Sequence, residues 1–365
     1  MNKLIALLLS GLIIYSCNSP QKKTGLSILD YAYPDRSITT DISKKDFEVQ
    51  EVKEIRQIPL EIIMMNKEVD VLTKDGYLIV KTLSKYNGAK MINIFSEDGS
   101  KHIKGLAPYG EGPNEFIDLR IISTNEKGTL CYILSLHNNK IYVLRNNLSL
   151  EYISTFPTPK NVKNFRARYH DLFHLYGDEF FCQQRAQDGL GLCKINVNDS
   201  TVTGLVGLNF SESLNSFWQI YTGHAAYNSK KNRIVYAMGY FDRILLFDAE
   251  GNHLKVVQCG SPRNLVSKNR SELYETGEEV TYYKGIFANE NFIYILYKGE
   301  KAYSPDFDKN GHHYIEKYDW EGNPIKRYKL PKGMRFNGGC TTSEKDVFYL
   351  ICSHEDEFLY RVILD

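Results

Sequence analysis

Hydrophobic and polar residues alternate with a period of two along most of the chain, which is the pattern of half-buried β-strands. The stretches "MINIFSEDGSKHIKGLAP", "RILLFDAEGNHLKVVQCGSP" and "YIEKYDWEGNPIKRYKLP" each place two such strands around a tight turn rich in Asp, Asn and Gly. Helical periodicity is confined to a turn or two near 266–276. The pattern therefore predicts an all-β protein.

This hairpin recurs five times, and "IYVLRNNLSLEYISTFPTP" and "LCKINVNDSTVTGLVGL" are the other two copies. The turns fall at Asp98, Asn147, Asn198, Glu250 and Glu321. A second hairpin precedes the copies, as in "KEVDVLTKDGYLIVKTL" and "ENFIYILYKG". Four strands per unit, here named A to D, and a spacing of about 50 residues are typical of β-propeller blades.

The two ends of the repeat region complement each other. The C-terminal "EFLYRVILD" has the pattern of a strand C with no strand D after it, and "VKEIRQIPLE" at 52–61 that of a strand D with nothing before it. We expect the first strand to complete the last blade, because this leaves no long unpaired edge. The sequence thus predicts a six-bladed β-propeller of four antiparallel strands per blade over residues 49–365. Five or seven blades, or two stacked β-domains, are the alternatives.

The N-terminus has the pattern of an export signal. Lys3 precedes the apolar "LIALLLSGLII", which is too short for a mature transmembrane helix, and "IIYSC" resembles a bacterial lipobox apart from Tyr15. We expect residues 1–16 to be a lipoprotein signal peptide, Cys17 to carry the lipid, and 17–48 to form a flexible tether. The alternative is an ordinary secretory signal. Asn18 favours the outer membrane, and the lack of an acidic cluster in the tether favours its periplasmic side.

The amino-acid composition limits the classes of partner that the protein can be expected to bind. The formal net charge is +1, so nothing draws the whole chain toward nucleic acid, and the membrane contact that we expect is the lipid anchor. Tyrosine and phenylalanine, 26 and 18 residues, suit pleated strands. No CxxC occurs, which excludes the usual zinc spacing. Two cysteine pairs flank candidate turns, and each is either a disulfide or two buried free thiols: Cys182 with Cys193, and Cys340 with Cys352.

The stretch "GLAPYGEGPNEFIDL" at 105–119 is predicted to be a joint between blades 1 and 2. Gly110 and Gly112 do not precede a helix, so a phosphate-binding loop has no mechanism here. The glycines permit a sharp turn, and Phe116 is expected to pack between the blades. Three charged or polar residues of this stretch are expected to be exposed on the long-looped face and remain candidates for a functional role: Glu111, Asn114 and Glu115.

A resemblance follows from these motifs. "GEGPNEF" with "GTLCYILSLHNNKIYVL" is similar to the NHL-type propeller repeat, and "YFDRILLFDAEGN" repeats its second half. Arg120 stands where such repeats often carry proline. With the lipobox, residues 50–365 resemble the TolB-like six-bladed propeller lipoproteins of Gram-negative anaerobes. The resemblance implies the architecture and an extracytoplasmic location, without a settled activity.

Strand order sorts the loops by face. The D-to-A linkers and the B–C loops share one face, here called the top face, and the A–B and C–D turns share the bottom. The long segments 157–166, 208–217, 260–280 and 299–312 all fall on the top face. Because long loops on a rigid scaffold commonly carry binding sites, we expect function there.

The innermost strands carry candidate ligand-binding residues around the mouth of the central channel. Cations would suit a carboxylate, an acidic sugar or a phosphate: Arg120, Arg166, Arg168, His170, His224, Lys284 and Arg335. Trp218 and Tyr283 would stack against a sugar, although interblade packing is the alternative for the aromatic residues. A polar, water-filled channel would explain the cations equally, and Glu115, Asp118 and Asp70 would neutralise them.

Metal and catalytic motifs are weak. In a strand His170 and His174 point the same way about 13 Å apart, too far for one metal. "DFDKNG" at 306–311 begins like a calcium loop, but Lys317 stands where the glutamate ligand belongs. We therefore expect no cofactor, and no catalytic residue is assigned. The leading hypothesis is a binding or scaffolding module for a glycan, a peptide or an envelope protein. A glycan-acting lyase or hydrolase using the channel-mouth Arg/His cluster is the alternative, and a structural role in an envelope complex is a third.

Overall fold

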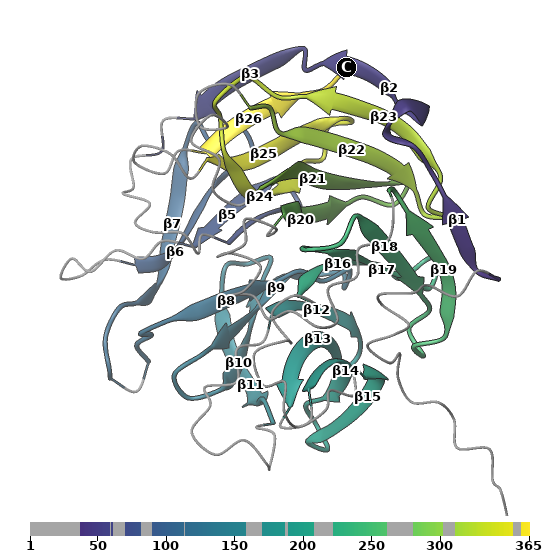
Figure 1. Cartoon of the computed structure of the whole chain (residues 1–365). Coiled ribbons are helices and arrows are strands. Elements are labelled where there is room, and N and C mark those ends of the chain that lie inside the picture. The colour runs from purple at the N-terminus through teal and green to yellow at the C-terminus, as the bar shows by residue number, and fades with distance from the viewer. Residues whose placement is uncertain are drawn as a thin grey trace, which may run out of the picture.

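The chain forms six β-sheets arranged as blades in a ring (Figure 1). The computed structural model describes residues 37–58, 60, 70–81, 90–112, 114–157, 170–186, 189–207, 222–260, 280–301, 311–352 and 359–365. Each blade contains four antiparallel strands in the order A, B, C, D, which confirms the six-bladed propeller expected from the repeat.

The first three blades are consecutive along the chain. Blade 1 comprises β4 (Val71–Lys74), β5 (Tyr77–Lys81), β6 (Lys90–Ser96) and β7 (His102–Pro108). Blade 2 comprises β8 (Leu119–Ile122), β9 (Thr129–Ser135), β10 (Lys140–Arg145) and β11 (Leu150–Thr155). Blade 3 comprises β12 (His170–Tyr176), β13 (Glu179–Ala186), β14 (Gly189–Asn196) and β15 (Thr201–Gly207).

The other three blades carry the N-terminal segment on their outer side. Blade 4 comprises β16 (Gly223–Asn228), β17 (Arg233–Met238), β18 (Arg243–Phe247) and β19 (His253–Gln258). Blade 5 comprises β20 (Val280–Ala288), β21 (Phe292–Lys301), β22 (Tyr314–Asp319) and β23 (Pro324–Lys329). Blade 6 takes β24 (Phe336–Thr341), β25 (Val347–Cys352) and β26 (Leu359–Ile363) from the C-terminus, and β3 (Glu54–Ile58) completes it.

Ring closure follows the prediction. β3 pairs antiparallel with β26, from Glu54 opposite Ile363 to Ile58 opposite Leu359. The described residues form one hydrophobic cluster at each of the six interfaces between neighbouring blades. The core is therefore a ring of interblade layers, and the inner strands contact each other around the axis, β20 with both β16 and β24.

The joint at 105–119 also matches its prediction. Phe116 is buried against residues of blades 1 and 2, and its ring centroid lies 5.2 Å from that of Tyr142. The backbone N–H of Phe116 donates to the carbonyl of Pro108 at 2.9 Å. Gly110 has a φ of +156°, a backbone conformation that residues with a Cβ rarely adopt, so the turn favours glycine.

The N-terminal segment forms a belt, which we define as residues 37–53. It contains β1 (Thr39–Asp41), the one-turn 3-10 helix η1 (Lys44–Asp46) and β2 (Glu48–Glu51). β1 adds a parallel strand to β19, and β2 adds one to β23, before the chain enters β3 (Figure 1). The sequence pattern assigns residues 37–48 to a flexible tether, whereas in the structure they carry β1, η1 and the first residue of β2.

The described cysteines lie on or next to strands and form no disulfide. Cys182 and Cys193 are direct partners across β13 and β14, whereas Cys340 lies opposite Tyr349 and Cys352 opposite Phe336. All six cysteines of the described residues are buried free thiols. Among the described residues, no helix has the length and apolar character needed to cross a membrane.

Candidate functional site

The two faces of the ring differ in the length of their connections. Every A–B and C–D turn on the bottom face lies within the described residues, and the longest is 123–128. The longest connections of the chain, 208–222 and 259–279, join a strand D to a strand A and so begin and end on the top face. The expected sorting of long loops onto one face is confirmed by the strand order.

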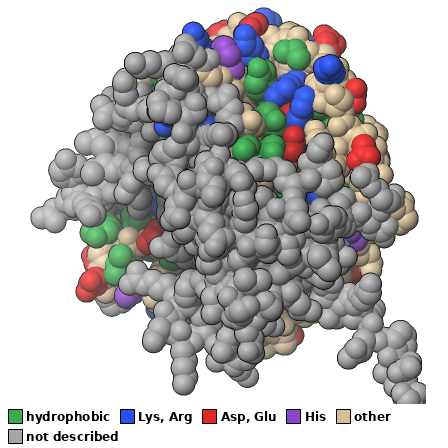
Figure 2. Space-filling view, in the orientation of Figure 1, with side chains coloured by type: hydrophobic (Ala, Val, Ile, Leu, Met, Phe, Trp, Pro, Cys, Tyr) green, Lys and Arg blue, Asp and Glu red, His purple; other side chains and the backbone are tan. Residues whose placement is uncertain are grey.

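Described charges of both signs are interspersed on the surface. Figure 2 shows Lys and Arg side chains next to Asp and Glu side chains over the part of the ring where β22 and β23 lie. Such mixing agrees with the near-zero net charge of the chain. Any preference for an anionic ligand must therefore come from a local arrangement.

Arg120 occupies the predicted start of the inner strand of blade 2, but it is already paired. Its guanidinium lies 3.2 Å from the carboxylate of Asp70, which precedes the inner strand of blade 1. The other carboxylate oxygen of Asp70 accepts the backbone N–H of Ile121 at 3.1 Å. The neutralisation that we considered for the channel-mouth cations is thus observed for Arg120.

Three other predicted cations lie in, or directly before, consecutive inner strands. His224 is the second residue of β16, Lys284 lies in β20, and Arg335 directly precedes β24. All three side chains are partly exposed. Blades 4, 5 and 6 thereby each present one basic side chain near the axis of the ring. Arg166, Arg168 and Trp218 lie outside the described residues, as does the side chain of His170 at the first position of β12.

Tyr283 and Glu115 are placed differently from the expected channel mouth. Tyr283 is 1% exposed and packs in the core between blades 4 and 5, because the period of two turns it to the opposite side from Lys284. The exposed Glu115 carboxylate accepts the backbone N–H of Gly112 at 2.8 Å. Glu115 therefore stabilises the joint between blades 1 and 2.

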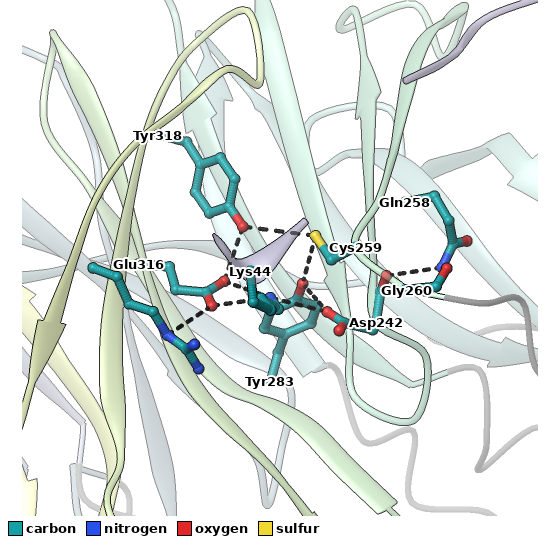
Figure 3. Close-up of polar contacts among 9 residues, drawn as sticks. Lys44, Asp242, Gln258, Cys259, Gly260, Tyr283, Glu316 and Tyr318 are labelled. Carbon is teal, nitrogen blue, oxygen red and sulfur yellow. Dashed lines mark hydrogen bonds and ion pairs between the residues drawn. The ribbon is translucent and has the colours of Figure 1, made fainter. Parts of the chain in front are cut away.

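The structure reveals a polar cluster that the sequence did not indicate, shown in Figure 3. The Nζ of Lys44, from the belt, lies 2.9 Å from Glu316 Oε1 and 3.1 Å from Asp242 Oδ1. It also lies 3.9 Å from the ring centroid of Tyr297, within cation–π range. We call the residues that surround this ammonium group the Lys44 cage: Asp242, Cys259, Tyr283, Tyr297, Glu316 and Tyr318.

The two carboxylates of the cage come from different blades and are held independently. Asp242 lies between β17 and β18 of blade 4, where the Gln258 amide donates to its backbone carbonyl at 3.1 Å. Glu316 lies on β22 of blade 5 and is fully buried. Arg327, its cross-strand partner on β23, lies 3.3 Å from Glu316 Oε1.

Two phenols complete the polar contacts of the cage. Tyr283 donates its hydroxyl to Asp242 Oδ1 at 2.7 Å, and Tyr318 donates to Glu316 Oε2 at 2.8 Å. Each carboxylate is therefore shared between the Lys44 ammonium and a buried tyrosine hydroxyl. Phe47, which follows η1, packs edge-on against Tyr318 with ring centroids 5.4 Å apart and so fixes the belt beside the cage.

The protonation states follow from burial and charge. Burial alone would lower the pKa of Lys44, but the negative charges of Glu316 and Asp242 outweigh it and raise that pKa above its ordinary value. Burial raises the pKa of the Cys259 thiol to about 12, despite the nearby Lys44 charge, so the reactive thiolate is disfavoured. The cage therefore holds a fixed ammonium charge at neutral pH and is suited to binding, not to proton transfer.

The buried histidines are likewise structural. Burial lowers the pKa of His174, whose Nδ1 and Nε2 lie 2.8 Å from the Thr124 hydroxyl and the Gly177 carbonyl respectively. Burial, with the charges of Lys298 and Lys284, lowers the pKa of His313 to about 3. Within the described part of the chain, no group of three or more His, Cys, Asp or Glu side chains is arranged to hold a metal ion.

One sequence signal for the cage existed. "SKKD" at 43–46 has the spacing of a capping box, and the structure shows both of its hydrogen bonds, from Lys45 N to Ser43 Oγ and from Ser43 N to Asp46 Oδ2. This motif marks an ordered turn inside the expected tether. Nothing in the sequence connects it to Asp242 and Glu316, which lie far along the chain.

Comparison with known proteins identifies a family that shares this architecture. Residues 46–336 match the family described as TolB-like 6-blade propeller-like. A solved member of the DUF4221 family from Bacteroides vulgatus has 12% identity and a TM-score of 0.61, covering 86% of this chain and 97% of its own. A putative exported protein from Bacteroides fragilis has 11% identity and a TM-score of 0.57, covering 90% and 99%. At such identities the solved structures support the fold alone, and no curated protein matches the chain.

Proposed function

Because the chain belongs to the TolB-like six-bladed propeller family, we propose that it is a binding or scaffolding module of the cell envelope. In this proposal a lipid on Cys17 anchors it to the outer membrane, facing the periplasm. The top face then binds a glycan, a peptide or an envelope protein.

The asymmetry of the two faces is the observation that carries this proposal. All long connections join strand ends on the top face, while no bottom connection is longer than 123–128. Loops that a fold does not need for closure are where binding residues usually lie. The described polar clusters, in contrast, have their groups committed to each other, as in the Lys44 cage.

An acidic ligand is favoured by the three basic side chains on consecutive inner strands. His224, Lys284 and Arg335 are partly exposed near the axis, where a carboxylate or sulfate would contact them from the top face. Arg120 is paired with Asp70 and is left out of the test below. The ligand class is thus an acidic glycan or a peptide rich in Asp and Glu.

The experiment is a binding panel on the full chain in detergent, with polygalacturonate, chondroitin sulfate and neutral dextran as probes. The triple variant His224→Ala/Lys284→Ala/Arg335→Ala should weaken binding of the acidic polymers at least about tenfold, as expected for losing one or more charged contacts. The matched control removes three exposed lysines of bottom turns, Lys127→Ala/Lys230→Ala/Lys345→Ala, and should bind like wild type. Equal losses in both variants, or no binding by wild type, would contradict the proposal.

The same panel decides between binding and catalysis. A lyase would convert an acidic polymer to unsaturated products that absorb ultraviolet light, and a hydrolase would release reducing ends. Binding without either product supports the module, whereas turnover that the top-face variant loses would favour the glycan-acting enzyme. The anchor is tested separately, because Cys17→Ser should move the protein from the membrane pellet to the soluble fraction.

A further inference from the structure

The Lys44 cage divides cleanly into a receptor and an occupant. Both carboxylates, the thiol and all three tyrosines come from blades 4 and 5. The ammonium group alone comes from the belt, on the one-turn helix η1. Blades 4 and 5 each have four strands of their own, and the belt adds a fifth to each. The receptor is therefore formed by parts of the fold that do not depend on the belt for their strand pairing.

The chemistry of the receptor is that of a site for a primary ammonium group. A primary ammonium has three N–H donors and a compact charge. Figure 3 shows Lys44 between Glu316 on one side and Asp242 on the other, and the Tyr297 ring provides a π-face. The guanidinium of Arg327 stacks 3.8 Å from the Tyr314 ring centroid and is paired with Glu316. Because Arg327 is held in this way, the position of the Lys44 ammonium group is available to a second cation.

The belt that carries the occupant is held by two short strand pairings and by Phe47, which is 5% exposed in the core between blades 4 and 5. β1 pairs with β19 through three residues, from Thr39 to Asp41, and β2 pairs with β23 through four, from Glu48 to Glu51. The Lys44 side chain remains 19% exposed, so water and small solutes reach it. Withdrawing Lys44 would leave Asp242 without the ammonium group and Glu316 with Arg327 alone, which favours refilling by another cation.

We propose that the Lys44 cage between blades 4 and 5 is a binding site for primary alkylammonium groups, which Lys44 occupies in cis. Its ligand class is a lysine side chain or an alkylamine, and such a ligand competes with the belt. The belt is thereby a releasable latch on the outer side of the propeller. This site is distinct from the top-face cations, and it does not depend on the function proposed for them.

Chemical rescue of the full chain tests the site. Lys44→Ala should lower the melting temperature, and n-butylamine should raise it again by a few degrees in a saturable manner at constant ionic strength. The uncharged n-butanol and the bulky tetramethylammonium ion should not. The matched control is Lys45→Ala, the exposed neighbour on η1, which should melt like wild type and show no amine response.

A second variant distinguishes the cage from nonspecific amine effects. Lys44→Ala/Glu316→Gln keeps the shape of the site but removes a carboxylate, and it should lose the rescue. If Lys44→Ala does not fold, wild type provides the measurement: butylamine should accelerate hydrogen exchange of the amides of β1, and butanol should not. The proposal is overturned if butylamine shifts Lys44→Ala and Lys45→Ala equally, or if wild-type β1 exchange is unaffected in that second measurement.

Discussion

Blade 5 contacts two lysines whose ammonium groups lie in similar surroundings but on different kinds of backbone. Lys317 lies on β22 in the middle of a sheet, 2.7 Å from Asp346 of blade 6 and 4.4 Å from the ring centroid of Phe292. Lys44 lies on the belt, in a cage of two carboxylates and aromatic rings. The Lys317 side chain is 7% exposed, whereas that of Lys44 is 19% exposed.

The difference in backbone distinguishes a permanent contact, that of Lys317, from one that we propose to be exchangeable, that of Lys44. Lys317 and Asp346 both belong to blades that hydrogen bonds and interblade packing fix on all sides. Lys44 joins two such blades through a segment held by short edge pairings and by the buried ring of Phe47. The same combination of carboxylate, aromatic ring and ammonium group therefore joins blades 5 and 6 permanently at Lys317. At Lys44 it attaches the belt to blades 4 and 5.

The largest loss in the free energy of unfolding is expected from breaking the ion pair between Lys317 and Asp346. Lys317→Ala leaves the carboxylate of Asp346 buried without its cation, which should cost about 3–5 kcal/mol in the free energy of unfolding. Urea denaturation measures this loss. The double variant Lys317→Met/Asp346→Leu removes both charges and should recover most of it. A loss below about 1 kcal/mol in the single variant would show that the pair is not effectively buried.

Lys44→Ala should cost less, about 2–3 kcal/mol, because water reaches the partly exposed cage once the lysine is gone. The damage should also be local. Hydrogen exchange should accelerate at the amides of β1 and η1 while those of β22 stay protected, since blade 5 keeps its own four strands. Equal acceleration in both places would contradict the view that the belt is a separate latch.

An acid titration sharpens the comparison with a third buried group of blade 5. His313 is buried near Lys298 and Lys284, and its pKa is lowered to about 3. The folded state therefore favours neutral His313, so its contribution to stability is complete above about pH 6.5 and is lost as the pH falls toward 3. His313→Gln should reduce the slope of unfolding free energy against pH in this window by up to about 1.4 kcal/mol per unit. An unchanged slope would mean that His313 titrates normally.

The smallest effect is expected for a surface pair of blade 3. Lys194 lies 3.2 Å from Glu179, and both side chains are more than a fifth exposed. Lys194→Ala should change the unfolding free energy by less than about 1 kcal/mol, and added salt should diminish even that. Urea denaturation at low and high salt provides the measurement. A loss as large as that of Lys44→Ala would mean that ring and carboxylate burial add nothing to the cage.

The propeller was predictable because its information is local and repeated. Alternating strands and tight turns give each blade, and the unpaired patterns at 52–61 and at the C-terminus indicate how the ring closes. Phe116 was recognisable as an interblade residue because its glycine-rich turn precedes an inner strand. These features depend on residues close in sequence, apart from the closure itself.

The belt was not predictable from the same pattern. β1 reads "TTD" and β2 reads "EVQE", and both remain largely exposed at the outer edge of the sheets, so neither shows the alternation of a half-buried strand. The cage brings together Lys44, Asp242 and Glu316 from three segments that are far apart in sequence. Taken alone, each of these residues looks like an ordinary charged residue of a turn or strand. At the channel mouth the period of two sends Tyr283 and Lys284 to opposite sides, and only the strand register shows which one is buried.

Ring closure by β3 also sets the order of events in folding. Residues 54–58 are synthesised early, yet their partners, 359–363, form the last strand of the propeller along the chain. Pairing elements so distant in sequence is entropically expensive and slow, so blades with local hairpins should form first and the ring should close last. Until then β26 presents a bare edge to any neighbouring chain. The step most exposed to misassembly is therefore the final one, when the first segment of the propeller finds the last.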